Sequence, residues 1–411
     1  MILRSSLRKL ITLINISVFF IPFFVSCEKE QMVSNIQNEY LFSLDYGNFE
    51  NELNVFDIAE VGTVKTSLVM QDGFFFIANG EAKKIMEMNS YGNLLNLIYN
   101  EETNPSPSAR PDETTVNSTR NSVPYPFNDI SSVAVDSRKY LYVVDKLLPE
   151  YCEIDLKNNQ ILSQIVLRFD DSGKYIDYIG QQGPGGIPFP YIENIYATDA
   201  GELVIVCSVN KGKVVYWFSK EGFPIHTISL SADNIPNPYA DEKTDSFVSI
   251  QNAVPDYRAR ILYVSIDCFK SFVDEASHVQ SGINYEGTLL YPVYIENEMF
   301  GKPMEIPPYT EEITQEFSKQ TFDIPYEFLG ATSSGWLFFV VSIDSGLSIQ
   351  MVQLDGQRIL KRNLALDRTN CLYYALNLST RGIISSLVVK PEHAEVGWWR
   401  TDSLIQAVID N

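Results

Sequence analysis

Histidine, paired cysteines and helical periodicity are all scarce in this sequence, and each shortage excludes a class of protein. The three histidines, His226, His278 and His393, are far apart, and no H-E-x-x-H or H-x-H motif occurs. A zinc or copper centre is therefore not expected, because such centres need clustered histidine or cysteine ligands. No G-x-S-x-G motif is present, and although the order of residues leaves a Ser-His-Asp triad open, nothing marks one. No catalytic residue is predicted.

Positive charge is also in short supply. The chain has 31 Lys and Arg against 52 Asp and Glu over 411 residues, a net charge of −21. Nucleic acids and anionic membrane surfaces attract proteins through a surplus of Lys and Arg, so a nucleic-acid partner is not expected. A hydrophobic content of 45% is enough for a folded core, which excludes a disordered chain.

The first 26 residues resemble a bacterial lipoprotein signal peptide. Basic residues precede an apolar run that is too short and too interrupted to span a membrane. The end of this run, Phe24-Val25-Ser26-Cys27, is similar to a lipobox, in which a small residue precedes the cysteine that receives diacylglycerol; phenylalanine stands where leucine is usual. We therefore predict a signal peptide over 1–26, lipid attachment at Cys27 and a lipidated tether over 27–40.

Removal of this segment changes the charge and indicates a location. Residues 1–26 hold three cations and no acid, so the mature body has 28 basic against 52 acidic residues, a net charge of −24. Acyl chains contribute about 0.8 kcal/mol per buried CH₂ and so hold a soluble domain on a bilayer. The expected place is the bacterial cell envelope, lipid-anchored, facing the periplasm or on the outer membrane. Glu28 rather than Asp after the cysteine favours the outer membrane.

The other four cysteines are Cys152, Cys207, Cys268 and Cys371. They form no C-x-x-C pair, which excludes a metal knuckle or a thioredoxin-like motif. Most lie in apolar runs, so we expect buried free thiols. An oxidising envelope leaves a disulfide open without indicating which pair would form it.

The body of the chain has the pattern of an antiparallel all-β protein. Short runs of β-branched and aromatic residues alternate with turns rich in Gly, Asp, Asn and Ser. A degenerate unit of four strands recurs six times. Because a lone four-stranded sheet cannot bury both faces, radial stacking of the units is favoured. We predict a six-bladed β-propeller of four-stranded antiparallel blades.

The predicted propeller is a single domain over residues 41–411. Six units leave about 64 residues each, more than the 40–50 usual for a propeller blade. Insertions are therefore expected near 101–125, 231–246 and 296–325. In the second unit the first three strands are predicted at Ile130–Asp136, Tyr140–Asp145 and Cys152–Asp155.

Part of the chain resembles the NHL-type β-propeller repeat. The stretch Asp170–Gly186, followed by Pro188–Ile195, matches the family's Gly-rich turn and F-x-x-P-like segment. Asp136–Asp145 resembles its D-x-x-G hairpin, with Lys139 where glycine is usual. With the lipobox, the resemblance implies a six-bladed propeller lipoprotein of a bacterial envelope, which indicates shape more than function.

Oxygen-bearing side chains at the starts of inner strands are the candidate metal ligands. This arrangement is similar to that of lactonase-like propeller hydrolases, which hold Ca²⁺ in the channel with Glu, Asn and Asp, as suits a hard cation. The comparable residues are Asp129, Glu193, Asn194 and Asn252, with Asn128, Gln251 and Asn377 in similar places. Since Asn and Asp are also common beside turns, solvated strand ends are the alternative. No other cofactor is predicted.

Aromatic residues are the candidate binding groups. Trp398, Trp399 and the pair Tyr373-Tyr374 offer rings that stack on sugars or on a partner's aromatic side chains; packing between blades is the alternative.

Two functions follow from these observations. The first is a non-catalytic scaffold, anchored in the envelope, that binds a protein, peptide or glycan through its loops and channel mouth. The alternative is a lactonase-like hydrolase with Ca²⁺ in the channel. Oxygen ligands converging in the channel would favour the enzyme, and an apolar or aromatic rim would favour binding.

Overall fold

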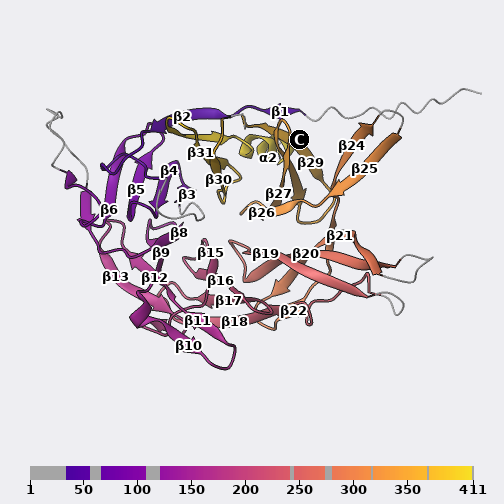
Figure 1. Cartoon of the computed structure of the whole chain (residues 1–411), viewed down its shortest axis with the longest axis horizontal. Coiled ribbons are helices and arrows are strands. Elements are labelled where there is room, and N and C mark those ends of the chain that lie inside the picture. Colours follow the sequence, from indigo (N-terminus) through magenta and orange to yellow (C-terminus); the bar gives the residue numbers. More distant parts are fainter. Residues whose placement is uncertain are drawn as a thin grey trace, which may run out of the picture. The chain divides into compact units, whose positions relative to one another are not determined.

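The computed structural model describes residues 34–55, 66–107, 121–240, 245–273, 280–315, 318–367 and 370–409. The chain divides into two units, Met1–Val33 and Ser34–Asn411. The predicted signal peptide, Cys27 and the first part of the predicted tether lie outside the described residues. Taken by itself, the second unit is a ring of six small sheets (Figure 1), so the predicted all-β, six-bladed propeller is confirmed.

Each blade is a mostly antiparallel sheet of four or five strands. The strands of each blade are given below in order from the channel outward. Blade 1 contains β3 (Thr66–Gln71), β4 (Phe74–Asn79), β5 (Lys84–Asn89), β6 (Leu94–Tyr99) and β7 (Asn121–Pro124). Blade 2 contains β8 (Ile130–Val135), β9 (Leu141–Lys146), β12 (Gln164–Phe169), β13 (Tyr175–Gly180) and β14 (Gly183–Pro184). Blade 3 contains β15 (Ile192–Ala197), β16 (Leu203–Val209), β17 (Gly212–Phe218) and β18 (Pro224–Ser231).

The last three blades are less regular. Blade 4 contains β19 (Ser246–Pro255), β20 (Ile261–Val273), β21 (Gln280–Tyr294) and an outer edge divided into β22 (Met299–Phe300) and β23 (Met304–Ile306). Blade 5 contains β26 (Glu327–Ala331), β27 (Trp336–Ile343), β28 (Gly346–Gln353), β29 (Ile359–Ala365) and β1 (Asn35–Ile36). Blade 6 contains β30 (Tyr373–Leu378), β31 (Ile384–Val389), β32 (Ala394–Trp399) and β2 (Glu39–Leu44).

Strands from the start of the chain close the ring. β2 pairs antiparallel with β32 and supplies the fourth strand of blade 6, while β1 pairs parallel with β29 at the edge of blade 5. Both strands begin within residues 27–40, which the sequence assigned to the tether. The folded part therefore starts several residues before the predicted boundary at residue 41, because pairing with the last two blades orders this segment.

The turn after the inner strand is built in the same way in five blades. A side-chain oxygen at its start accepts a hydrogen bond from a backbone N–H two to four residues later, and this fixes the turn locally. These side chains are Asp136, Thr198, Asp256, Thr332 and Ser379. In blade 2, Lys139 has φ of +63°, a conformation that glycine adopts more easily, which explains why glycine is usual at this place.

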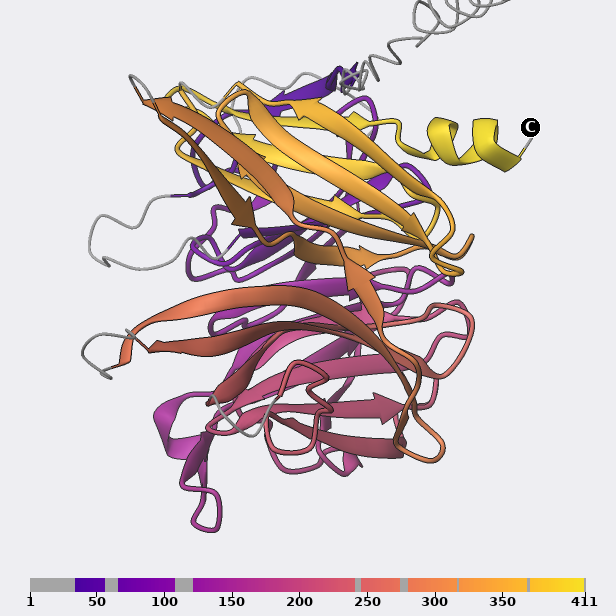
Figure 2. The same cartoon turned by 90° about the vertical axis from the view of Figure 1, so that its right-hand side faces the viewer.

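The ring has two different faces. We call the loop face the one on which the chain passes from the outer strand of one blade to the inner strand of the next, and the turn face the opposite one. Figure 2 shows the extended hairpins on the loop face at the left and α2 (Asp402–Ile409) at the right. The loop-face elements include the hairpin β24 (Tyr309–Gln315) and β25 (Ser318–Ile324), which falls within the predicted insertion at 296–325.

One predicted strand of blade 2 is wrong. Cys152–Asp155 is not its third strand; that place belongs to β12. Residues 147–163 instead form an inserted two-stranded hairpin on the loop face, made of β10 (Glu153–Asp155) and β11 (Gln160–Leu162) after the 3₁₀ turn η2 (Pro149–Tyr151). The sequence pattern of this hairpin is similar to that of a blade strand, so periodicity alone did not separate them.

The core lies between the blades. Six clusters of buried apolar residues occur in the described part of the chain, one at each interface between neighbouring blades. Cys152, Cys207, Cys268 and Cys371 are all free thiols, as expected, with Cys207 and Cys268 buried and the other two half-buried. Within the described residues, no helix is long and apolar enough to cross a membrane.

A buried lysine makes the stability of the fold depend on pH. Lys84 is fully buried at the start of β5, where its ammonium donates to the Phe49 carbonyl oxygen. Burial lowers the pKa of Lys84 to about 7, although the carboxylate of Glu52 partly opposes this shift. The unfolded chain therefore binds one more proton than the folded chain between about pH 7 and the ordinary lysine pKa, so stability rises with pH across this range.

We expect the free energy of unfolding to increase by about 1.5 kcal/mol from pH 7 to pH 8.5. In Lys84→Met this increase should disappear, because the substituted side chain has no proton to lose. Urea denaturation at several pH values measures the effect, and Lys220→Met, at an exposed lysine, is the control that should keep it. An unchanged slope in Lys84→Met would show that another group is responsible.

Candidate functional site

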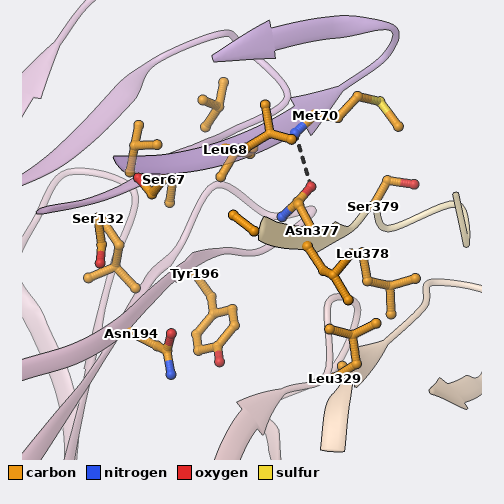
Figure 3. Close-up of a pocket in the computed structure, with 18 of the residues that line it drawn as sticks. Ser67, Leu68, Met70, Ser132, Asn194, Tyr196, Leu329, Asn377, Leu378 and Ser379 are labelled. Atoms are coloured by element: carbon orange, nitrogen blue, oxygen red, sulfur yellow. Dashed lines mark hydrogen bonds between the residues drawn. The ribbon is translucent and has the colours of Figure 1, made fainter. Parts of the chain in front are cut away.

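The inner strands of all six blades surround a central channel of about 400 Å³. Its lining is formed by β3, β8, β15, β19, β26 and β30, so every blade contributes. The uncharged polar side chains of the lining are hydroxyls and amides, and Figure 3 labels Ser67, Ser132, Asn194, Tyr196, Asn377 and Ser379 among them. Among the described lining residues, the only charged side chain is that of Glu327.

Two channel amides connect neighbouring blades. The Asn377 side-chain oxygen accepts a hydrogen bond from the Met70 backbone N–H at 2.9 Å, joining blade 6 to blade 1 (Figure 3). The Asn252 side-chain nitrogen donates to the Phe328 carbonyl oxygen at 3.0 Å, joining blade 4 to blade 5, while its oxygen accepts from Ala253 N–H at 2.9 Å. These amides therefore hold the inner strands in register around the channel.

The structure brings together two of the four predicted metal ligands. Asn194 and Asn252 line the channel. Glu193 instead pairs with the Lys213 ammonium, because the inner strand has a β-bulge between Ile192 and Asn194 that turns its side chain elsewhere. The backbone N–H of Asp129 donates to the Asp145 carboxylate at 2.7 Å, away from the channel lining.

The channel residues do not fit Ca²⁺. A calcium ion needs six to eight oxygen ligands, several of them carboxylates. Here the side-chain oxygens of Asn252 and Asn377 already accept backbone hydrogen bonds. No group of three or more His, Cys, Asp or Glu residues in the described part of the chain is placed to hold a metal ion. The geometry therefore does not favour the lactonase-like alternative.

A second space, which we call the side cleft, adjoins the channel. It measures about 620 Å³ and lies where blades 4, 5 and 6 meet, at the loop-face ends of their strands. Glu327, Leu329, Val340 and Leu376 line both spaces, so the cleft and the channel are adjacent. Each of the two spaces falls within the size range of small-molecule sites.

The side cleft combines aromatic rings with planar polar groups. Tyr326 and Tyr374 supply the rings; the Tyr326 hydroxyl lies 3.2 Å from Ser348 Oγ, and the Tyr374 hydroxyl lies 3.3 Å from Ser342 Oγ. The polar groups are Gln251, Asp267 and Glu327. Tyr374 is only partly buried, whereas Tyr326 is almost fully buried, so Tyr374 is the ring available to a ligand.

Asp267 is the buried acid of this cleft. Its side chain is almost fully buried, and its carboxylate accepts hydrogen bonds from the Thr288 hydroxyl and the Gln251 amide. Burial raises the pKa of Asp267, and these two hydrogen bonds partly oppose that shift. The two donors hold the carboxylate in one orientation at the wall of the cleft.

The two predicted binding tryptophans, Trp398 and Trp399, differ in burial and in their contacts. Trp399 is completely buried between blades 5 and 6, where its ring is part of the core and is not accessible to a ligand. Trp398 is half-buried near the ring-closing strand: its indole N–H donates to the Glu39 carboxylate at 2.9 Å, and its ring lies 6.1 Å from that of Phe75. Of the predicted aromatic set, Tyr374 lines the side cleft and Tyr373 lines the channel.

Several large apolar side chains are exposed on the inserted hairpin β10–β11 and the segment before it. Five large apolar side chains are exposed there, the most extreme being Leu156 at 88%. The others are Leu148, Tyr151, Ile154 and Ile161. Sequence reasoning missed this surface because it placed residues 152–155 inside a blade, where such side chains would be covered.

No protein-family model matches the chain, and no curated protein matches it. Similar solved structures include a gluconolactonase from Xanthomonas campestris (9% identity, covering 81% of this chain and 85% of that chain, TM-score 0.38). A streptogramin B lyase is also similar, with 12% identity, covering 88% of this chain and 98% of that chain, at a TM-score of 0.35. The β-propeller domain of the Trilobed protease from Pyrococcus furiosus has 10% identity, covering 66% of this chain and 80% of that chain, at a TM-score of 0.34. At such low sequence identities and TM-scores, the activities of those proteins cannot be assigned to this chain.

Proposed function

We propose that this chain is a bacterial envelope lipoprotein, anchored through Cys27, that acts as a non-catalytic scaffold and binds a protein partner on its loop face. The anchor is supported by the lipobox-like sequence. The binding role is supported above all by the exposed apolar side chains of the β10–β11 hairpin. The hydroxyls and amides of the channel suit hydrogen bonds to neighbouring blades or to a ligand. Such groups are not the usual general acids and bases of an enzyme.

The edges and the exposed apolar side chains of the β10–β11 hairpin favour contact with a protein partner. Among the described strands β10 pairs only with β11, so no other described strand covers the outer edges of this sheet. A lone two-stranded hairpin is marginally stable in water. Ile154 and Ile161 are exposed and lie opposite each other across this hairpin, and neighbouring exposed apolar side chains are typical of an interaction surface. Three acids, Glu150, Glu153 and Asp155, outnumber the single cation Lys157 around the apolar side chains, which favours a partner with an apolar centre and a basic rim.

Site-specific photo-crosslinking in cells tests this role. A photoreactive residue in place of Leu156 is expected to give a discrete adduct of higher mass. The same residue in place of Tyr91, which is equally exposed at 84% but lies in the β5–β6 turn on the turn face, is the matched control. Adducts of equal yield at both positions, or none at position 156, would contradict the proposal.

A further inference from the structure

The side cleft has the chemistry of a saccharide site, and three observations bear on its ligand. The first is the partly exposed ring of Tyr374 at the loop-face end of β30. The face of an aromatic ring packs well against the apolar C–H face of a pyranose, while its hydroxyl remains available for polar contacts. The hydrogen bond between Tyr374 and Ser342 fixes this ring across the boundary between blades 6 and 5.

The second observation concerns the other polar groups that line the cleft. Gln251 is exposed, Glu327 is exposed and Asp267 is buried at the wall. Carboxylates and amides present two planar atoms each, so one side chain can bond two neighbouring hydroxyls of a sugar. A β-bulge between Ile250 and Asn252, and a second between Phe328 and Gly330, adjust the inner strands here. Bulges of this kind redirect side chains beside binding sites.

The third observation is the charge of the hollow. Among the described residues lining the side cleft and the channel, none is Lys, Arg or His, and the two acids are Asp267 and Glu327. An anionic sugar would lose water there without gaining a cationic partner. The adjacent channel presents the hydroxyls and amides of Ser132, Asn194 and Asn377, which suit further neutral hydroxyls.

We infer that the side cleft binds a neutral oligosaccharide, with Tyr374 stacking on one sugar ring and Gln251, Asp267 and Glu327 bonding its hydroxyls. This inference goes beyond the proposed protein-binding role and places a second ligand class at a site apart from the β10–β11 hairpin. A basic peptide, attracted by the two acids alone, is the competing occupant and is one outcome of the test below.

Binding of the full-length chain is measured by titration calorimetry with four probes: cellohexaose, maltohexaose, an oligogalacturonate and hexalysine. We expect at least one neutral hexasaccharide to bind at least tenfold more tightly than the oligogalacturonate. Tyr374→Ala should weaken that binding about tenfold, because it removes the stacking surface. Tyr374→Phe, which keeps the ring, should stay within about threefold of the wild type, and so should Tyr91→Ala on the turn face.

The outcomes separate the two proposals. Binding of hexalysine or of oligogalacturonate alone, no binding of either neutral hexasaccharide, or neutral binding that Tyr374→Ala leaves unchanged would each overturn the saccharide site. Circular dichroism shows whether Tyr374→Ala remains folded, and loss of binding in Tyr374→Phe as well would point to the hydroxyl rather than to stacking and also overturn it. The crosslink at position 156 is independent of these results, so its presence or absence tests only the proposed scaffold role.

Discussion

Phe42→Ala is expected to destabilise the propeller by about 3–5 kcal/mol, the usual cost of deleting a buried phenylalanine ring. Phe42 lies on the ring-closing strand β2 and is buried between blades 6 and 1, where its ring meets that of Phe75 edge-on at 5.7 Å. The lost contacts therefore weaken the interface between the last blade and the first. Thermal unfolding followed by circular dichroism measures the change.

Tyr40→Ala is the matched control for this variant. Tyr40 belongs to the same strand, but its side chain is 58% exposed. Its removal should change stability by less than about 0.5 kcal/mol, the range of most surface substitutions. If Phe42→Ala cost no more than Tyr40→Ala, the pairing of β2 with blade 6 would not be what closes the ring.

Cys27→Ala is expected to release the protein from membranes. In our proposal the acyl chains on Cys27 are the only attachment, since each buried methylene contributes about 0.8 kcal/mol and an acidic body gains nothing from an anionic surface. The wild-type protein should enter the detergent phase in a Triton X-114 partition, and the variant should stay in the aqueous phase. Immunoblotting of both phases measures this.

Cys152→Ala is the control for lipidation, because it removes a half-buried thiol of the propeller and leaves the lipobox-like segment unchanged. It should partition like the wild type. Cys27→Ala protein that still sediments with membranes at low salt would contradict the anchor and would require another attachment.

The strands of the propeller were readable from the sequence because each is a short, local pattern. Five blades consist largely of neighbouring segments, so the alternation of apolar runs and turns was enough to count them. The fourth strand of blade 6 was missed, since β2 pairs with β32 from the other end of the chain and no local pattern encodes such a pairing. For the same reason the predicted tether extended too far.

The site was predicted less completely than the fold. Asn194 and Asn252 were named and do line the channel, because positions near the start of an inner strand face it. Glu193 was named and does not, since a bulge decides which of two adjacent side chains points inward. Asp267 was not singled out: it lies within the apolar run of β20, and only the packing of blades 4, 5 and 6 reveals that it faces a cleft.

The closure of the ring also determines when the protein can fold. Glu39 and Trp398, which meet in the last blade, are separated by 359 positions. A ribosome that adds about 5–20 residues per second therefore reaches Trp398 roughly 20–70 seconds after it has added Glu39. During that time the earliest strand has no partner, and blade 1 lacks one of its two neighbours. The last blade, and with it the ring, is therefore completed only after almost the whole chain has been synthesised.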